Sequence, residues 1–332
     1  MYRVLILVAT SLTLIVIVVG AYVRLSDAGL GCPDWPGCYG QPTPSFAASS
    51  IARAVADQGG EQGPVSLVKA WKEMGHRYLA GALGLLIAWI AVLSWRQGSG
   101  SGSTRGLTAT LVAVVAFQAA LGMWTVTLLL KPVIVTAHLL GGLATLGLLL
   151  WLSLTQWRFV RTAEGPSMRP VAIAGLVVVV LQIALGGWVS ANYAALACPD
   201  FPLCQGKAVP DMDIANAFHV FRELGKTREG ALLSLEALTA IHWMHRMFAL
   251  VVAAVLAWLV WQGSRTISFR GLSAWVGVML VLQISLGIST VLAGLPLALA
   301  AAHNLGGALL FGSLVLLNFF AFSGLAPRRA PS

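Results

Sequence analysis

The stretch FQAALGMWTVTLLLKPVIVTAHLLGG, residues 117–142, returns as LQISLGISTVLAGLPLALAAAHNLGG, residues 282–307, at an offset of 165 positions. A shorter motif behaves in the same way, because GHRYLA at 75–80 matches MHRMFA at 244–249. Each long copy holds two apolar segments, a short turn and one histidine. Internal similarity of this kind predicts two halves of the same architecture in tandem.

Composition places both halves in a membrane. The chain of 332 residues is 58% hydrophobic and 10% charged, with a mean hydropathy of +0.83. Backbone polar groups in lipid must be satisfied within their own segment, so each long apolar run is predicted to be a helix. The first run is longer than a signal-peptide core and lacks a small-x-small cleavage site, so we expect it to be retained. Eight runs of about 20 apolar residues reach the length that spans a bilayer: roughly 4–24, 71–95, 107–130, 132–156, 171–192, 239–261, 271–293 and 297–320.

The predicted fold is an all-α membrane protein whose eight transmembrane helices form two tandem four-helix bundles. With four helices in each half, both halves start on the same side of the membrane, which predicts pseudo-twofold symmetry along the membrane normal. We expect an N-terminal half at 1–156, a cytoplasmic linker at 157–170 and a C-terminal half at 171–332. The segment RQGSGSGSTR, residues 96–105, is predicted to be a flexible inner loop.

Arginines predict the orientation of the helices. The loops after the second, fourth and sixth helices, together with the termini, hold ten arginines and one acid, Glu164, so both termini should be cytoplasmic. The net charge of +9 then reflects basic inner loops that face the anionic cytoplasmic leaflet. The sequence lacks a basic stripe with interleaved aromatic residues, so it gives no indication of nucleic-acid binding. The ten are Arg3, Arg96, Arg105, Arg158, Arg161, Arg169, Arg265, Arg270, Arg328 and Arg329.

The two long outer connections, near 25–70 and 193–238, hold all four cysteines. Cys32 and Cys38 lie in GLGCPDWPGCYG, and Cys198 and Cys204 lie in ALACPDFPLCQG, with the same order of Cys, Pro, Asp, aromatic and Pro. In an oxidising compartment such close pairs are expected to be the disulfides Cys32–Cys38 and Cys198–Cys204.

Four histidines follow the repeat. His76 corresponds to His245 and His138 to His303, so each half has one on its second helix and one on its fourth. Ionisable groups in a membrane are costly and indicate function, and two imidazoles from two helices suit the iron of a haem. Gly141, Gly142, Gly306 and Gly307 follow the later histidines and are predicted to leave room for a flat macrocycle. Interhelical hydrogen bonding is the alternative role for these histidines. Copper or zinc fits less well, because no carboxylate or thiol recurs beside both pairs.

The halves differ beside these histidines. Glu73 lies three residues before His76, whereas His242 lies three before His245. Glu73 is either a general base or the interfacial partner of Lys72 or an arginine.

Two arginines follow the proposed ligands, and two further histidines remain. Arg77 and Arg246 could bind haem propionates or anchor at headgroups. His242 is a weaker ligand candidate, and His219 is predicted to be a surface residue of an outer loop.

In these residues the sequence resembles the haem A synthase family over nearly the whole chain, through eight helices, the EMGHR and MHR motifs, the two later histidines and the outer cysteine pair. The resemblance implies an oxidoreductase of the bacterial cytoplasmic (inner) membrane. Such an enzyme converts a methyl group of haem O to the formyl group of haem A by successive hydroxylations, for cytochrome oxidase assembly. It also implies the haem O synthase and assembly factors as partners. It leaves the electron acceptor unidentified and allows a homo-oligomer.

The resemblance further assigns roles to residues. It implies that His76 and His138 flank the substrate haem in the N-terminal half, and that Glu73 is the catalytic carboxylate. His245 and His303 would be the ligands of a resident haem b in the C-terminal half. Cys32 and Cys38 would form the functional outer disulfide, whereas the resemblance assigns no role to Cys198 and Cys204.

Two readings of the disulfides and two rival functions stay open. The oxidation of a methyl group to an aldehyde removes four electrons, so an exposed disulfide could relay electrons to thiols, or each pair could clip a lid over a haem pocket. One rival function is a dihaem b-type cytochrome that transfers electrons at the outer face. The other is an export protein for haem or a thiol compound, which gives no reason for Glu73 in only one half.

Overall fold

The computed structural model describes residues 1–58, 60, 63, 65–96, 102–157 and 159–326, and these are mostly α-helical. Eight helices are long and apolar enough to cross a membrane, so the prediction of an integral multi-pass membrane protein is confirmed. They are α1 (Tyr2–Leu25), α3 (Leu67–Arg96), α4 (Gly102–Thr127), α5 (Pro132–Thr155), α6 (Gly165–Ala191), α8 (Leu235–Ser264), α9 (Arg270–Leu292) and α10 (Leu297–Ser323).

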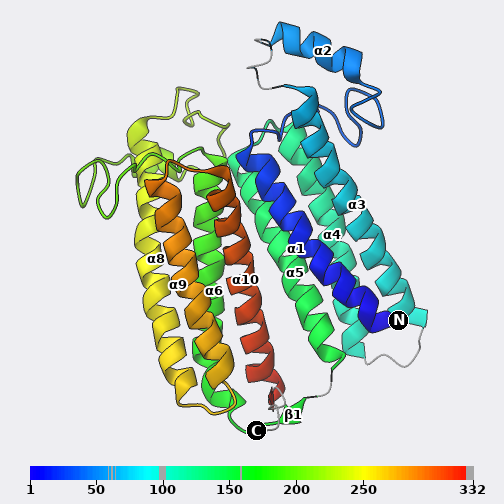
Figure 1. Ribbon diagram of the computed structural model, residues 1–332, viewed down its shortest axis with the longest axis vertical. Helices are drawn as coiled ribbons and strands as arrows, with labels where there is room; N and C mark the ends of the chain where they lie inside the picture. The colour runs from blue at the N-terminus through cyan, green and yellow to red at the C-terminus, as the bar shows by residue number, and fades with distance from the viewer. Residues whose placement is uncertain (59, 61–62, 64, 97–101, 158, 327–332) are drawn as a thin grey trace.

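The eight helices form two groups that stand side by side (Figure 1). In the first group α1 contacts α3, α3 contacts α4, α4 contacts α5, and α5 returns to α1; α6, α8, α9 and α10 close a second ring in the same order. Between the groups, α5 contacts α6, α1 contacts α10, and α5 contacts α10. Exchanging α1 with α6 and α5 with α10 reproduces these contacts, which is the pattern that the predicted twofold axis requires.

The last helix, α10, departs from this symmetry. In the apolar stretch of α10, 78% of the residues are buried inside the protein, whereas the corresponding share is 17–33% in the other seven candidate spans. Phe311, Phe319 and Phe320 on its inner half pack into the largest apolar cluster, with aromatic contacts to Trp151 of α5 and Phe159. The protein therefore has its main core around α10, where the two groups meet.

Serine caps extend two helices beyond their apolar runs on the outer side. α3 begins at Leu67 and α8 at Leu235, about one turn before the predicted starts near 71 and 239. Ser66 Oγ accepts the backbone N–H of Lys69 at 3.1 Å, and Ser234 Oγ accepts that of Ala237 at 3.2 Å. Such caps satisfy helix donors that would otherwise lack partners. Glu73 and its counterpart His242 lie within two turns of these starts.

The side of the protein where α1 begins and α10 ends is more ordered than predicted. Strand β1 (Val160–Arg161) pairs antiparallel with β2 (Leu325–Ala326), and α6 already begins at Gly165, inside the predicted linker. Pro166 stands near the start of α6, where its missing N–H leaves no hydrogen bond unmade. Arg158, Arg328, Arg329 and residues 97–101 of the predicted flexible loop lie outside the described residues.

The start of α1 and the end of α10 lie at the same end of the protein, as eight spans require (Figure 1). Helix α2 (Ala48–Asp57) lies at the opposite end, within the first cysteine-bearing connection. The second such connection holds the short helix α7 (Ile214–Ala217). All four cysteines therefore belong to the side away from the termini.

Candidate functional site

The structure brings the predicted histidines together in two pairs. His76 on α3 lies near His138 on α5, and His245 on α8 lies near His303 on α10. Each pair lies within one ring of four helices. The second and fourth helices of each half thus face each other through their histidines.

Each histidine packs against a glycine on a neighbouring helix. A Cβ atom at Gly20 of α1 would lie 2.8 Å from the Cε1 atom of His76, and one at Gly186 of α6 would lie 3.1 Å from that of His245. Any side chain there would push the imidazole away. Gly122 of α4 and Gly287 of α9 stand in the same way 3.4 and 3.0 Å from His138 and His303.

These four glycines were not singled out from the sequence. The repeat contained the signal, because Gly122 and Gly287 share a position in the two quoted stretches. Gly20 and Gly186 stand 166 residues apart in the first helix of each half.

The glycines that were singled out have a different role. A Cβ atom at Gly141 would collide with the amide of Gln118, and one at Gly306 with that of Gln283. Gln118 Nε2 donates to the carbonyl of His138 at 2.8 Å, and Gln283 Nε2 to that of His303 at 2.9 Å. The prediction that Gly141 and Gly306 leave space for a macrocycle is therefore wrong: they admit glutamines that brace the histidine backbone.

The imidazoles have nitrogen atoms free for ligation. The Nδ1 atoms of His76, His138 and His303 are buried without a hydrogen-bond partner, whereas Nδ1 of His245 meets Gln182 Nε2 at 3.2 Å. A buried polar atom without a partner costs about 1–3 kcal/mol, so three such imidazoles fit poorly with a purely structural role. Gln182 Nε2 also donates to the backbone carbonyl of His245 at 3.0 Å, so this glutamine braces the helix beside the ring as Gln118 and Gln283 do. The four residues therefore fit a group that binds ring nitrogens, such as haem iron.

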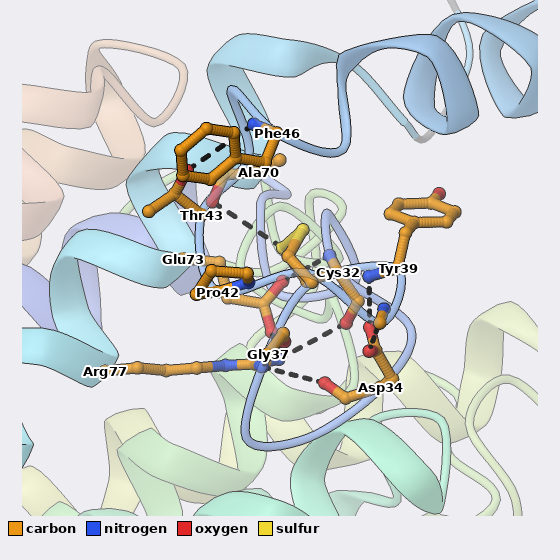
Figure 2. Close-up of a disulfide and its surroundings, with 12 residues drawn as sticks. Cys32, Asp34, Gly37, Tyr39, Pro42, Thr43, Phe46, Ala70, Glu73 and Arg77 are labelled. Carbon is orange, nitrogen blue, oxygen red and sulfur yellow. Dashed lines mark hydrogen bonds and ion pairs between the residues drawn. A yellow bond between two sulfur atoms is a disulfide. The ribbon is translucent and has the colours of Figure 1, made fainter.

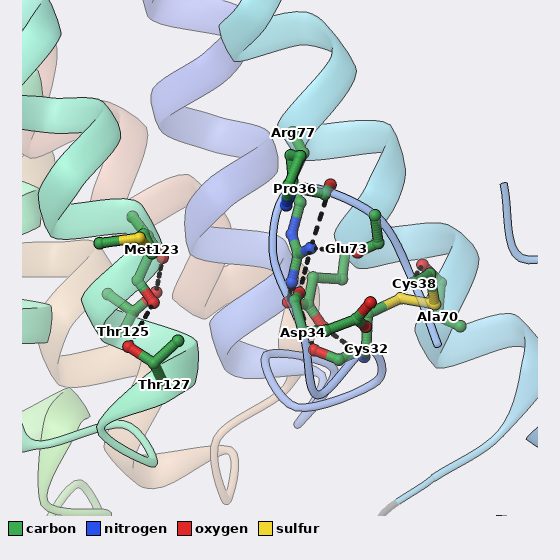
Figure 3. A network of polar contacts seen from close by, with 12 residues as sticks. Cys32, Asp34, Pro36, Cys38, Ala70, Glu73, Arg77, Met123, Thr125 and Thr127 are labelled. Carbon is green, nitrogen blue, oxygen red and sulfur yellow. Dashed lines mark hydrogen bonds and ion pairs between the residues drawn. A yellow bond between two sulfur atoms is a disulfide. The ribbon is translucent and has the colours of Figure 1, made fainter. Parts of the chain in front are cut away.

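Glu73 and Arg77 dock the first cysteine loop onto α3. Cys32 and Cys38 form a disulfide, and the backbone N–H of Cys32 donates to Glu73 Oε2 at 2.9 Å (Figure 2). Arg77 forms an ion pair with Glu73 and lies between it and the loop carbonyls (Figure 3). Its guanidinium donates to the carbonyls of Asp34 and Gly37, each at 2.7 Å, and to that of Cys32 at 3.3 Å. A planar cation with five donors suits a ring of carbonyls.

The second cysteine loop repeats this docking on α8. Cys198 and Cys204 form the second disulfide, and the N–H of Cys198 lies 3.2 Å from Nδ1 of His242. Arg246 donates to the carbonyls of Cys198 at 2.6 Å, Asp200 at 2.7 Å and Leu203 at 3.0 Å. In the first loop the Asp34 carboxylate accepts the backbone N–H groups of Tyr39 and Gly40. In the second loop the Asp200 carboxylate accepts those of Gln205 and Gly206.

His242 serves the loop less completely than Glu73 does. Arg246 Nε lies 3.3 Å from Nε2 of His242, so both ring nitrogens face donors. A neutral imidazole accepts at one nitrogen only, so one of these contacts is not a hydrogen bond. A carboxylate has acceptor sites for both donors and others to spare.

Both disulfides are shielded from water. Cys32 and Cys38 are 0% exposed, and the second pair is 0% and 2% exposed. Ile51 of α2, Val65 and Met74 belong to the apolar cluster around the first pair. The expectation of an exposed disulfide is therefore wrong, because thiol exchange at either pair requires the loop to open first.

The remaining predicted residues are placed as follows. The guanidinium groups of Arg77 and Arg246 bind loop carbonyls, and both Glu73 and His242 are buried. His219 is half-buried, and its Nδ1 atom is buried without a partner, so it is more enclosed than a surface residue.

The fold and site define a class of duplicated eight-helix membrane proteins that carry one histidine pair and one docked disulfide loop in each half. Residues 3–315 match the model of a family described as cytochrome oxidase assembly protein. The chain is 42% identical over 314 residues to the heme A synthase of Shewanella oneidensis, covering 93% of both chains. The chain belongs to the haem A synthase family.

More distant relatives carry the same name. The heme A synthase of Shouchella clausii is 31% identical over 267 residues, with 76% of this chain and 81% of that protein covered. The heme A synthase of Halalkalibacterium halodurans is 26% identical over 311 residues, with 90% of each covered. The similarity to the Halalkalibacterium halodurans protein, which covers 90% of this chain, therefore extends into both halves.

Proposed function

We propose that this protein is a haem A synthase, an oxidoreductase that converts a methyl group of haem O to the formyl group of haem A by successive hydroxylations. The observation that carries the proposal is the inequality of two otherwise matched sites. A carboxylate, Glu73, stands one helical turn from His76, whereas His242 stands at the same place beside His245. Electron transfer by two bound haems does not require this difference.

The substrate haem O belongs in the N-terminal half, between His76 and His138. His245 and His303 in the C-terminal half would hold a resident haem b, which supplies a one-electron redox centre when it is bound. The unpartnered imidazole nitrogens and the glycines against which the rings pack support both assignments.

Glu73 is the proposed general base. Its carboxylate accepts from Cys32 N–H and from Arg77, which leaves acceptor sites for a proton from water or substrate. Arg77 also fixes the carboxylate in position, because the same guanidinium is bound to three or more loop carbonyls. Conversion of the methyl group to the aldehyde with water releases four electrons and four protons.

The disulfide Cys32–Cys38 is proposed to take part in the electron transfer, and Cys198–Cys204 to clip its loop. The first pair lies directly over Glu73, so a change in the loop reaches the proposed base through one hydrogen bond. The family's haem O and haem A also imply the haem O synthase and cytochrome oxidase assembly factors as partners.

We place the protein in the bacterial cytoplasmic membrane with both termini in the cytoplasm, since the inner loops carry the arginines. A reporter fused to the C-terminus tests this topology. Activity of that reporter on the outer face alone would refute it.

Expression of the chain in a host that makes haem O, followed by mass spectrometry of the extracted haems, tests the function. Haem A, or its alcohol intermediate, should appear only with the chain present. Unchanged haem O together with two bound b-type haems would instead support the dihaem cytochrome.

A further inference from the structure

A cleft of about 440 Å³ lies between α5 and α6, where the two halves meet near their outer ends. It is almost wholly apolar and is separate from the disulfide loops. The cleft is lined by residues of α5, α6, α8 and the second outer connection, among them Thr136, Ala137, Ala184, Trp188, Phe218 and Phe248.

One wall residue presents a hydroxyl that has nothing to bind. Thr136 Oγ1 is buried without a hydrogen-bond partner. A threonine within a helix normally donates to the carbonyl one turn earlier, as Thr145 does to Gly141 at 2.9 Å. The free hydroxyl at Thr136 therefore indicates a ligand with an oxygen acceptor.

The second outer connection contributes two apolar residues, Phe218 and Val220, to the cleft. Among the lining residues Thr136 is therefore the one that offers an unpartnered polar atom. A bare hydrocarbon chain would leave that atom unpaired.

Aromatic rings suit the cleft to a flat ligand. Trp188, Phe218 and Phe248 come from three different elements, and Trp188 Nε1 already donates to the carbonyl of Ala217 at 2.9 Å. That bond anchors the indole as a wall of the cleft. Rings of this kind stack against planar ligands.

We propose that this cleft binds an isoprenoid quinone. A quinone has a flat ring with carbonyl oxygens for Thr136 and an apolar tail that can follow the helices into the bilayer. The cleft also touches both histidine-bearing halves, since Ala137 precedes His138 on α5 and Phe248 follows His245 by three residues on α8. The ligand would therefore lie between the two proposed haem sites.

The quinone's role as electron acceptor rests on the proposed function. Each quinone takes up two electrons and two protons to become a quinol. One methyl group, one water molecule and two quinones then give one formyl group and two quinols, which balances the atoms and the four electrons.

The test uses the full chain purified in detergent, with decylubiquinone as the probe and protein-free micelles as the blank. Quinone that copurifies is quantified by mass spectrometry, and probe binding is followed by quenching of tryptophan fluorescence. Ala184→Phe fills the cleft and should weaken binding by about tenfold or more. Thr136→Val removes one hydrogen bond, and the expected loss is about three- to tenfold.

Val18→Phe on α1 is the matched control, because Val18 holds the place of Ala184 in the first half and is likewise half-buried. It should bind decylubiquinone like the wild type. The proposal is overturned by wild-type binding no greater than that of the micelles, by an equal loss in Val18→Phe, or by phospholipid or haem O that occupies the cleft and resists the probe. Haem A formation with an artificial acceptor is measured separately, so a failure of the cleft and a failure of the proposed function are distinguishable.

Discussion

The backbone N–H of Cys32 donates to the Glu73 carboxylate across 2.9 Å, so the disulfide loop and the proposed base are joined by one hydrogen bond. The other half makes the matching contact from Cys198 to an imidazole, His242. An acceptor at this position is therefore needed to dock the loop, whichever chemistry follows. What a carboxylate adds is negative charge and spare acceptor sites.

The first prediction separates docking from catalysis. Glu73→Gln keeps an oxygen that accepts from Cys32 N–H but removes the base. Haem binding and the rate at which a water-soluble phosphine reduces Cys32–Cys38 should stay within about threefold of the wild type, whereas haem A formation should fall by about 100-fold or more. Extracted haems and alkylated peptides are both measured by mass spectrometry.

Glu73→His is the control for this pair, because it copies the second half. It should also lose haem A formation while the loop stays docked. Wild-type haem A formation in Glu73→Gln would show that Glu73 is not a base. A large rise in disulfide reduction together with the loss of product would assign the residue to docking alone.

The second prediction follows from the burial of the first disulfide. Ile51 on α2 is 2% exposed and belongs to the apolar cluster that covers Cys32 and Cys38. Ile51→Ala removes buried contacts, and core truncations of this kind cost about 2–5 kcal/mol. Reduction of Cys32–Cys38 by phosphine should become at least about tenfold faster, with Cys198–Cys204 as the internal control. Equal rates in the variant and the wild type would mean that α2 does not limit access.

The third prediction concerns which disulfide acts in the reaction. Both pairs should be oxidised in isolated membranes. Cys32→Ala or Cys38→Ala should lower the yield of haem A more than Cys198→Ala or Cys204→Ala, because Cys32 donates to the carboxylate of Glu73 whereas Cys198 faces the imidazole of His242. Small and equal losses with normal haem content would favour two structural clips.

The repeat made much of this molecule predictable from sequence. Eight apolar runs predicted the membrane-spanning helices, and the offset of 165 paired His138 with His303. Both predictions were possible because an apolar segment, and an ionisable residue within it, can be recognised from neighbouring residues in the sequence. Side-chain contacts across loops are not local. Glu73 and Cys32 are 41 residues apart, so neither the burial of the disulfide nor the carbonyl cage around Arg77 followed from spacing.

The misreading of Gly141 has a similar cause. A glycine in a helix indicates that another group packs closely against the helix backbone, but the sequence does not show which group it is. Here it is Gln118, one helix away. The pairing of β1 with β2 also escaped notice, since strands of two residues leave no periodic pattern.

The fourth prediction is a pH dependence in the second loop. The backbone N–H of Gly206, followed by that of Gln205 and the charge of Arg246, holds the pKa of Asp200 below its ordinary value of 3.8. A lowered pKa in the folded loop stabilises it above the unfolded pKa, and this is lost as the pH falls through the folded pKa. Asp200→Asn should therefore speed reduction of Cys198–Cys204 at pH 7, and the difference from wild type should shrink as the pH falls below 3.8 and vanish below the lowered pKa. Identical rates at pH 7 would contradict this.

The fifth prediction assigns the two histidine pairs. His245→Ala and His303→Ala should each lower the resident haem content and alter its low-spin b-type spectrum, because one axial bond is lost. His76→Ala and His138→Ala should leave that spectrum in place while haem A formation is lost. Absorption spectra of the purified variants, with extracted haems measured in parallel, check both statements.

The glycine contacts make this assignment sharper, because they move a ligand without removing it. A Cβ atom at Gly287 would lie 3.0 Å from the Cε1 atom of His303, so Gly287→Ala should displace that imidazole by a few tenths of an ångström and shift the resident haem's spectrum and potential. Gly20→Ala is the matched change in the first half, where a Cβ atom would lie 2.8 Å from the Cε1 atom of His76, and it should act on haem A formation and leave the resident haem's spectrum unchanged. If Gly20→Ala perturbs the resident haem and Gly287→Ala does not, the two sites are exchanged between the halves. If neither substitution changes the spectrum, the histidines do not ligate a haem from the positions they occupy here.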